Sequence, residues 1–340
     1  MPICSTWLSD WLAQILVGQD VREDHAEQTA RLLVRADLRG YDAHGAVRIV
    51  DYVQRLRSGH VNPAAEARLS WSNGALLVDG DLGLGQAIAA AALENAIERA
   101  RTTAVVPCLI RAAGHMGAMG IYALLIAEQG LLGLACQETR PVLWPEGASR
   151  RAIGNNPLAF AAPLRERAPL VFDMASSAVS HGRLMSLIGE GAPIAQGWVN
   201  DSRGLPTTDP SAALSGGLAP LGGHKGIGLA MLVQCLAGSL TGATLRNDDP
   251  SADGSSAGNI GALFLVINPD MVIERSMFDR AMSQWLDYFL GSFPDGGRYP
   301  GQRSAEIEAK RRVSGIPLSP GVLSRLAELG RAVDLPFSPP

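Results

Sequence analysis

The sequence predicts an α/β layer architecture that is preceded by a helical segment. Residues 5 to 60 carry apolar side chains at helical spacing. From residue 67 onward, short apolar runs of strand length alternate with helical segments, which is typical of α/β proteins. The chain has 340 residues, of which 47% are hydrophobic and 18% charged, so it can bury a large core.

The first 60 residues are expected to form three helices. The first carries apolar residues at helical spacing, namely Trp7, Leu8, Trp11, Leu12, Ile15 and Leu16. The second runs from about Glu23 to Leu38 and is ended by Gly40. Asp42 is expected to cap the third, whose apolar face would include Val47, Val50, Tyr52, Val53 and Leu56.

The rest of the chain is expected to supply the sheet and the helices that cover it. Strands are predicted at 76–80, 105–111, 131–137, 158–162, 170–173 and 263–268, with 158–162 and 170–173 as candidates for central strands. Helices are predicted at 86–99, 121–128, 226–239 (buried), 277–290 (amphipathic) and in the tail from Ser304. Residues 246–259 are rich in Asn, Asp, Ser and Gly, which predicts a mobile surface loop.

Composition excludes several classes of function. The net charge is −4 and there is no long basic run, so no nucleic-acid partner is expected. No apolar stretch is long enough to span a membrane, and the N-terminus lacks a secretory signal, so a cytoplasmic protein is expected. The four cysteines show no CxxC pattern, and three are expected to be buried thiols. The six histidines have no metal-ligand spacing, so no metal is expected.

A glycine-rich stretch from Arg111 to Ala123 holds a histidine, His115, between a predicted strand and a predicted helix. Glycines allow a close approach of the backbone to a ligand, and the free N–H groups at a helix start attract anions. A reactive histidine would suit this place. A glycine-rich turn with a solvated histidine explains the same stretch, and the stretch alone does not separate the two interpretations.

The segment Asp42-Ala-His-Gly-Ala-Val-Arg48 contains a second candidate pair. If the segment starts a helix, His44 and Arg48 share one face because they are four residues apart. A guanidinium can bind a carboxylate through two parallel hydrogen bonds, and a nearby histidine can donate a proton. The pair therefore suits an α-keto or α-hydroxy carboxylate, although a solvent-facing helix start remains the alternative.

Three further segments carry polar groups where strands meet helices. Asn155 and Asn156 precede a proline and predict a structured turn. Asp173 ends a predicted strand and is followed by Ser176 and Ser177, which are candidates for ligand contact or for a helix cap. Lys225 follows a glycine pair and can meet a phosphate, but the spacing does not match a Walker motif. The Gly80-x-x-Gly83-x-Gly85 order does not match the dinucleotide fingerprint either.

Six stretches taken together resemble one family, the malate/L-lactate dehydrogenase-like oxidoreductases of the second, non-Rossmann type. This family includes ureidoglycolate, sulfolactate and diketogulonate dehydrogenases and Δ1-piperideine-2-carboxylate reductases. The stretches are DAHGAVR at 42–48, GHMGAMGIY at 114–122, IGNNPLA at 153–159, FDMASS at 172–177, GWVNDSRGLPTTDP at 197–210 and PLGGHKG at 220–226.

The resemblance implies a large non-Rossmann nucleotide-binding α/β domain, residues 71–303. It also implies a smaller helical domain built from both chain ends, residues 1–70 completed by 304–340. It implies a homodimer that interconverts a small 2-hydroxy acid and its 2-oxo acid with NAD or NADP.

The resemblance also implies roles for particular residues. His115, His44 and Arg48 match catalytic positions, and His44, Arg48 and Asn155 match substrate contacts. The positions that match cofactor contacts are Met116, Gly117, Ala118, Met119, Gly120, Asp173, Met174, Ala175, His181, Gly182, His224, Lys225, Gly301 and Arg303.

Some positions depart from the family pattern. Ala43 and Arg183 stand where the piperideine-carboxylate reductases have the serine and aspartate of a proton relay, which counts against reduction of a cyclic ketimine. Asn155 stands where a threonine is common, which favours an unusual substrate. Reduction of Δ1-pyrroline- or Δ1-piperideine-2-carboxylate remains an alternative, as does a homologue that binds the cofactor without turnover. The substrate and the choice between NAD and NADP stay open.

Overall fold

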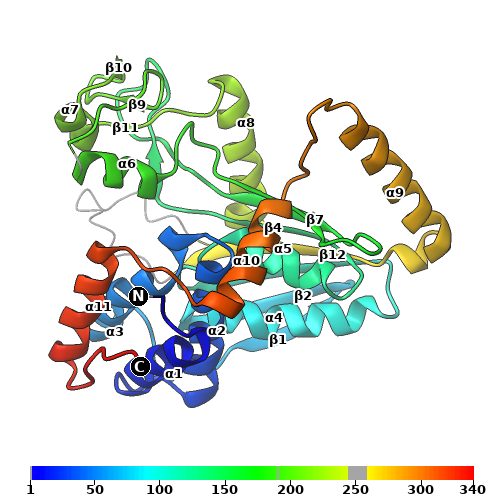
Figure 1. Ribbon diagram of the computed structural model, residues 1–340, viewed down its shortest axis with the longest axis horizontal. Helices are drawn as coiled ribbons and strands as arrows, with labels where there is room; N and C mark the ends of the chain where they lie inside the picture. Colours follow the sequence, from blue (N-terminus) through cyan, green and yellow to red (C-terminus); the bar gives the residue numbers. More distant parts are fainter. Residues whose placement is uncertain (1, 190, 244–258) are drawn as a thin grey trace.

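A seven-stranded mixed sheet runs through the middle of the molecule (Figure 1). The computed structural model describes residues 2–189, 191–243 and 259–340, so the loop expected at 246–259 lies outside the described residues except for Asn259. Among the described strands of this sheet, only β2 and β3 are parallel neighbours. In spatial order the strands are β1 (Arg68–Ser72), β2 (Ala75–Gly83), β3 (Val105–Ala113), β12 (Ile260–Ile267), β4 (Leu132–Gln137), β7 (Leu158–Ala162) and β8 (Leu170–Met174).

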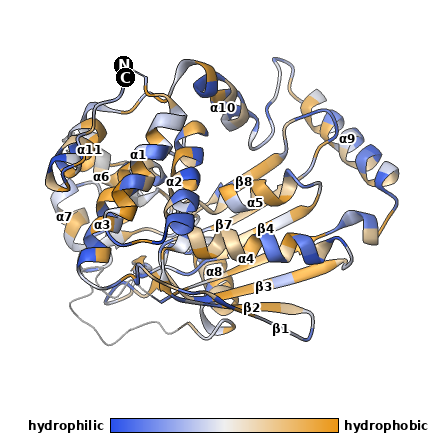
Figure 2. Cartoon of the chain, turned by 90° about the horizontal axis from the view of Figure 1, so that it is seen from below, coloured by the Kyte–Doolittle hydropathy of each residue, from blue (hydrophilic) through white to orange (hydrophobic). Residues whose placement is uncertain are grey.

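Two helices, α4 (Gly85–Ala100) and α5 (Met119–Ala127), cover one face of this sheet (Figure 2). Alternate strand residues such as Cys108 and Ile110 are buried beneath them, as the two-residue period of a strand requires. Tyr122 of α5 stacks on Phe264 of β12 with ring centroids 5.2 Å apart. Nearly every residue of α5 is buried, which explains why the helix is apolar on all sides.

The opposite face of the sheet is also apolar but is only partly covered. Leu265, Leu134, Phe160 and Phe172 lie in register across β12, β4, β7 and β8. Phe160 is 44% exposed and Phe172 36%. Helix α8 (His224–Val233) and the π-helical turn η3 (Gln234–Ser239) pack against the other end of this face.

The two ends of the chain meet in a helical layer (Figure 1). Helices α1 (Ser5–Val17), α2 (Glu23–Leu38), α3 (Ile49–Arg57) and α11 (Pro320–Ala332) share one apolar cluster. A backbone bridge joins Ile3 to Ile316. Helix α10 (Gln302–Ser314) is tied to α2 by the buried carboxylate of Glu308, which pairs with Arg35 at 2.7 Å and Arg39 at 2.8 Å.

A second, five-stranded sheet lies between β4 and α8 along the chain. Its strands in spatial order are β10 (Pro206–Thr207), β9 (Val199–Asn200), β11 (Gly217–Leu218), β5 (Pro141–Leu143) and β6 (Ile153–Gly154). With α6 (His181–Gly189) and α7 (Pro210–Ser215) it encloses a small core of its own. This sheet is not predicted from the sequence, because strands of two or three residues are too short to show a two-residue period.

Helix α9 (Arg275–Gly291) follows the short turn η4 (Pro269–Met271) and stands away from the rest of the molecule (Figures 1 and 2). Of its residues only Leu286 is buried within the described chain. Trp285 is 52% exposed and Tyr288 84%. The amphipathic pattern expected at 277–290 therefore presents apolar side chains to the outside. Within the described ranges, no helix combines the length and the apolar character that crossing a membrane requires.

The α/β class expected from the sequence is confirmed, but several details are corrected. Strand β8 is an edge strand rather than a central one. The segment 226–239 forms α8 and η3 but is not a buried helix, since Met231 and Leu232 are 56% and 48% exposed. Two cysteines are buried rather than three, because Cys235 is exposed.

Candidate active site

His115 lies between the end of β3 and the start of α5, where three elements converge. The loop 114–118 joins β3 to α5. Within this loop, Gly117 adopts the left-handed backbone region with φ of +82°. Gly85, the first residue of α4, lies so close that a Cβ there would stand 2.1 Å from the carbonyl oxygen of Gly114. Glycine at this position therefore lets α4 begin directly against the backbone that carries His115.

His44 and Arg48 lie on two short 3-10 turns rather than on one α-helix. Turn η1 (Asp42–His44) and turn η2 (Ala46–Arg48) are separated by Gly45, and α3 begins only at Ile49. The expected cap by Asp42 and the expected shared helical face are therefore wrong. The turns nevertheless bring His44 to His115, with the two rings stacked and their centroids 6.1 Å apart.

A buried carboxylate holds these turns in place. Asp37 of α2 is 1% exposed and accepts a hydrogen bond of 2.7 Å from the backbone N–H of Ala46. A Cβ at Gly45 would stand 1.8 Å from Asp37 Oδ1, so glycine makes room for the carboxylate. Burial raises the pKa of Asp37 to about 7, although the hydrogen bond from the Ala46 N–H lowers it.

This raised pKa predicts a pH-dependent effect of Asp37→Asn on stability. The folded carboxyl binds its proton more tightly than the unfolded one, so its contribution is full below about pH 4 and is lost as the pH rises through 7. Asparagine keeps an acceptor for Ala46 and carries no charge. Relative to the wild type, Asp37→Asn should therefore gain about 2–3 kcal/mol of unfolding free energy between pH 5 and pH 8 in urea titrations. Asp10→Asn, on the exposed side of α1, is the control, and an Asp37→Asn difference that is equal at both pH values would contradict the prediction.

Two residues that were not expected in the site lie behind His115: Tyr52 contacts the histidine, and Gln86 contacts Tyr52. The hydroxyl of Tyr52 lies 3.1 Å from His115 Nδ1, and Gln86 Nε2 donates to that hydroxyl over 2.5 Å. The sequence analysis expected Tyr52 only on an apolar helix face. A signal was present, since tyrosine and glutamine are polar residues at otherwise apolar or alanine-rich helix positions, but neither stands near His115 in the sequence.

The surroundings of His115 and His44 favour the uncharged form of both imidazoles. Burial, together with the charges of Arg48, His44 and Arg55, lowers the pKa of His115 well below its usual range. Burial and the charge of Arg48 lower the pKa of His44 to about 4. Both imidazoles are therefore uncharged at neutral pH, and His115 can accept a proton there.

Arg48 is held at the edge of this group with part of its guanidinium available. Its Nε donates to the carbonyl oxygen of Ala43 over 2.7 Å, and its Nη1 pairs with Asp51 at 3.0 Å. Among the described residues, Arg48 Nη2 forms no hydrogen bond or ion pair. The side chain is 30% exposed, so a ligand can reach it.

Asn155 and Asn156 form the structured turn that the sequence predicts. Asn155 Oδ1 accepts a hydrogen bond of 2.8 Å from Thr139 Oγ1, and the Asn155 carbonyl accepts from the backbone of Ser176. Asn156 is buried and donates through Nδ2 to the carbonyl of Ala230, so its role is structural. No contact with His44, Arg48 or His115 is formed by Asn155 in the described part of the chain.

The expected cofactor residues at 116–120 and 173–175 lie side by side. Asp173, at the end of β8, accepts a hydrogen bond of 2.9 Å from the N–H of Gly120 at the start of α5. Burial raises the pKa of Asp173 to about 6, although the hydrogen bond from Gly120 lowers it. The neighbouring expected residues lie on the same two elements. Met116, Ala118 and Met119 are buried around the start of α5, and Met174, the last residue of β8, and Ala175 are half-buried.

Two more helix starts meet this region. Helix α6 begins with His181 and Gly182, and a Cβ at Gly182 would stand 3.0 Å from the Cβ of Ala43. Helix α8 begins with His224 and Lys225, both exposed, and the preceding loop pairs with Ser177 through Pro220. The side chain of His181 lies outside the described part of the structure. Helix starts with free N–H groups beside a lysine suit a phosphate group.

The turn before α10 completes the set of expected cofactor residues. Gly301 adopts φ of +93° and lies against Val171 of β8, while Arg303 is exposed. The adjacent Gln302 has a buried Oε1 with no hydrogen-bond partner in the described chain. A buried amide oxygen without a partner is unusual and fits a position that a ligand completes.

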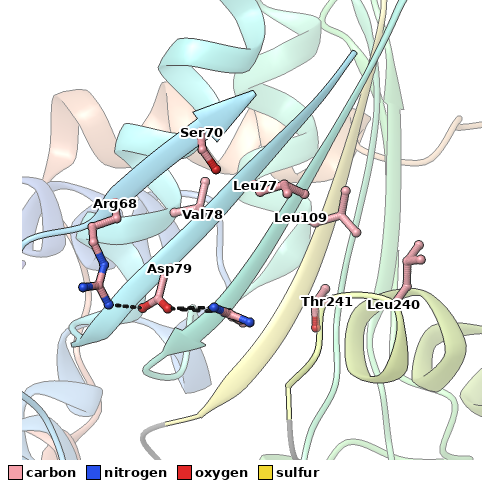
Figure 3. Close-up of a pocket in the computed structure, with 9 residues that line it drawn as sticks. Arg68, Ser70, Leu77, Val78, Asp79, Leu109, Leu240 and Thr241 are labelled. Carbon is pink, nitrogen blue, oxygen red and sulfur yellow. Dashed lines mark hydrogen bonds and ion pairs between the residues drawn. The ribbon is translucent and has the colours of Figure 1, made fainter. Parts of the chain in front are cut away.

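A hollow of about 390 Å³ lies apart from the group around His115, on the partly covered face of β1, β2 and β3 (Figure 3). Its wall carries Asp79, which pairs with Arg68 and Arg111 at 3.7 and 3.2 Å. Leu77, Leu109 and Leu240 complete an apolar side. None of its lining residues belongs to the group around His115. Among the described residues, no set of three His, Cys, Asp or Glu side chains is arranged to hold a metal ion.

Comparison with known proteins identifies similar chains over nearly the whole length. The family model described as malate/L-lactate dehydrogenase matches residues 3–327. Malate dehydrogenase of Pyrococcus horikoshii is 34% identical over 96% of this chain and 94% of its own length. Ureidoglycolate dehydrogenase (NAD(+)) of Escherichia coli K12 is 33% identical over 94% and 93%. (2R)-3-sulfolactate dehydrogenase (NADP(+)) of Chromohalobacter salexigens is 34% identical over 84% and 85%.

Solved structures give the same result. Sulfolactate dehydrogenase of Methanocaldococcus jannaschii superposes with a TM-score of 0.89 at 30% identity, covering 99% of this chain and 98% of that one. The Δ1-piperideine-2-carboxylate reductase of Pseudomonas syringae also has a TM-score of 0.89, at 32% identity and with coverage of 97% and 99%. The resemblance inferred from the six motifs is thus confirmed.

Proposed function

The chain belongs to the malate/L-lactate dehydrogenase family, and from this membership we propose that it is an NAD(P)-dependent oxidoreductase. It interconverts a small 2-hydroxy acid and the corresponding 2-oxo acid. The observation that carries the proposal is the group formed by His115, His44 and Arg48. It combines a proton-accepting imidazole with an available guanidinium at the edge of the site.

Each residue of this group has a distinct task. Arg48 binds the substrate carboxylate through its available nitrogen, which orients the carbon next to it. His115 removes the hydroxyl proton during oxidation and returns a proton to the carbonyl oxygen during reduction. His44, stacked beside His115, donates a hydrogen bond to the substrate. Asn155 contacts the far part of the substrate and contributes to substrate choice.

The cofactor NAD or NADP, when bound, supplies or accepts the hydride. Relatives of this chain include an NAD(+)-dependent and an NADP(+)-dependent dehydrogenase, so both cofactors fit the family. The starts of α6 and α8, with Gly182 and Lys225, would hold its phosphates. The start of α5, where the Gly120 N–H donates to Asp173, would contact another part of the cofactor. The turn with Gly301, Arg303 and Gln302, whose Oε1 has no partner among the described residues, would complete the site.

We further propose that the protein is a cytoplasmic homodimer. The support is the partly covered apolar face of the sheet with Phe160 and Phe172, together with helix α9, which exposes Trp285. A second copy of the chain is the occupant that suits both surfaces. Phe160→Glu and Trp285→Glu should each convert the dimer to a monomer in sedimentation experiments, whereas Val313→Glu, on exposed α10, should not. A monomeric wild type would contradict the proposal.

The domain division into 1–70 with 304–340, and 71–303, also remains our proposal. It is supported by two apolar clusters, one centred on the helical layer and one on the large sheet. The two parts also pack on each other, since Leu32 and Ala36 of α2 join the sheet cluster and Ala87 of α4 joins the helical one. Within the helical part, Glu308 of α10 pairs with Arg35 of α2 and with Arg39, which follows α2.

The test of the proposed activity follows absorbance at 340 nm with purified protein and NADH or NADPH in turn. The panel contains pyruvate, oxaloacetate, 3-sulfopyruvate, branched 2-oxo acids and the cyclic imino acids. Turnover of an open-chain 2-oxo acid is the expected result and decides the cofactor. Turnover of the cyclic imines alone would instead establish the ketimine reductase alternative. Cofactor binding in calorimetry without any turnover would favour a homologue that has lost catalysis.

A further inference from the structure

Tyr52, Gln86 and His115 form a continuous chain of hydrogen-bonding groups behind the proposed acid/base. Gln86 Nε2 donates to the Tyr52 hydroxyl over 2.5 Å. That hydroxyl lies 3.1 Å from His115 Nδ1 and 3.5 Å from the His115 carbonyl oxygen. Tyr52 is 3% exposed and Gln86 1%, so water does not compete for these groups. The other ring nitrogen of His115, Nε2, forms no hydrogen bond with a described residue and remains for the substrate.

The oxygen of the Gln86 amide takes no part in this chain of hydrogen bonds. Among the described residues, its Oε1 is buried and has no hydrogen-bond partner. Buried amide oxygens normally have one. Half a turn about the last side-chain bond exchanges Oε1 and Nε2, which have nearly the same shape. The Tyr52 hydroxyl can therefore meet either a donor or an acceptor at Gln86.

Catalysis by His115 requires Nδ1 to carry a proton. To accept the substrate proton, Nε2 must be bare, so the proton of the neutral ring sits on Nδ1. After acceptance, the imidazolium carries protons on both nitrogens. In both states Nδ1–H needs an acceptor, and an unpaired buried donor costs as much as a lost hydrogen bond or more. No carboxylate among the described residues forms a hydrogen bond or ion pair with His115.

We propose that Tyr52 and Gln86 are positioning residues that provide an acceptor for His115 Nδ1–H in both the neutral and the protonated ring. When Gln86 Nε2–H donates to Tyr52, Tyr52 donates to a bare Nδ1, and the proton of the neutral ring is then on Nε2, which cannot accept the substrate proton. When the amide is turned, Nδ1–H donates to Tyr52, whose hydroxyl donates to Gln86 Oε1, and Nε2 is free to accept a proton. No proton is lost or gained by Tyr52 or Gln86 in either arrangement. The inference rests on the proposed role of His115.

The charges around His115 make this neutral support important. His44 on η1, Arg48 on η2 and Arg55 on α3 all disfavour a protonated His115. Asp51, the nearest acidic group on α3, pairs with Arg48 at 3.0 Å and with Arg325 of α11 at 3.4 Å. The Tyr52 oxygen is therefore the group that can stabilise the imidazolium, because a hydrogen bond from a charged donor is stronger than one from a neutral donor.

The first test is Tyr52→Phe, which keeps the ring and removes the oxygen. We expect kcat to fall about tenfold in both directions, while KM changes by less than about twofold because Arg48 is untouched. The limb of the pH profile that reports His115 should move to lower pH, since the imidazolium loses its acceptor. Tyr41→Phe is the matched control, because Tyr41 is a half-buried tyrosine that packs against the sheet cluster and whose hydroxyl bonds to no described residue. A Tyr52→Phe profile that coincides with the wild type would overturn the proposal.

The second test asks whether Gln86 acts through Tyr52. Gln86→Met preserves the volume and removes the amide, and should lower kcat by about threefold. In the Tyr52→Phe background the same change should have no further effect, because coupled residues are not additive. Additive effects would show that Gln86 has only a packing role.

The third test does not depend on activity. In protein labelled with ¹⁵N-histidine, the ring nitrogens of His115 are assigned by their loss in His115→Asn and titrated by NMR. His115 should titrate at lower pH in Tyr52→Phe than in the wild type, and an unchanged titration would contradict the inference. If no acid in the panel is turned over, the proposed function fails, yet this titration still decides whether Tyr52 supports His115.

Discussion

Replacing His115 with asparagine is expected to lower kcat/KM for the 2-oxo acid by about 10²–10⁴-fold, which is the usual effect of removing a general acid or base. Asparagine fills most of the space of the ring and keeps a polar group beside Tyr52, but it cannot exchange a proton at neutral pH. Because the loss concerns a proton transfer, kcat should fall much more than KM rises. Steady-state kinetics in both directions, at saturating cofactor, measure this effect.

The matched control is His60→Asn. His60 is a half-buried histidine whose Nδ1 lies 2.5 Å from Ser58 Oγ at the end of α3, and it makes no contact with the proposed site. Its replacement should leave kcat/KM within about twofold of the wild type, as is usual for substitutions away from functional features. A His115→Asn protein that folds, binds cofactor and retains nearly full activity would show that another group moves the proton.

Replacing Arg48 with alanine is expected to lower kcat/KM by about 10²-fold, mainly through KM. The reason is that a hydrogen bond to a charged group contributes about 1.5–3 kcal/mol, and a guanidinium can offer two to one carboxylate. Arg48→Lys should fall between the wild type and Arg48→Ala, since an ammonium keeps the charge but not the planar pair of donors. Initial rates over a range of substrate concentrations separate KM from kcat.

A neutral substrate analogue separates carboxylate binding from other roles of Arg48. The wild type should prefer the 2-oxo acid over its amide, and Arg48→Ala should lose most of that preference. Arg57→Ala is the control, because Arg57 is exposed at the end of α3, the helix that follows Arg48, and donates to Gln19 over 2.8 Å. If Arg48→Ala keeps the preference for the acid, another cation binds the carboxylate. A thermal melt checks whether loss of the bond to Ala43 has disturbed η1 and η2.

The sequence was a good guide to elements of one strand or helix in length. Helix α2 has the predicted bounds, and strands β3, β4, β7 and β12 lie within a few residues of the predicted ranges. These elements depend on local periodicity, which any stretch of about ten residues carries. The prediction that the segment 42–48 starts an α-helix was wrong. The segment forms two 3-10 turns separated by Gly45, and Asp37 from α2 occupies the space that a side chain at Gly45 would need.

Several residues of the proposed site could also be predicted from the sequence motifs alone. His44 and His115 were chosen from separate stretches, and the structure brings their rings together. Asn155 was chosen in the same way, but the structure places it against Thr139 rather than against the histidines. A motif identifies a residue type in a local setting, whereas the distance between two motifs depends on the path of the whole chain.

By itself, the sequence determined the α/β class, the family resemblance and the set of groups available for chemistry, because composition, spacing and periodicity are properties of the linear chain. Only the tertiary structure decided that β12, from residues 260–267, inserts between β3 and β4, and that the two chain ends share one helical layer. It also decided that Tyr52 and Gln86 stand behind His115. Strand pairing and side-chain contacts between distant segments are selected by burial and register across the whole fold, which no local stretch of sequence contains.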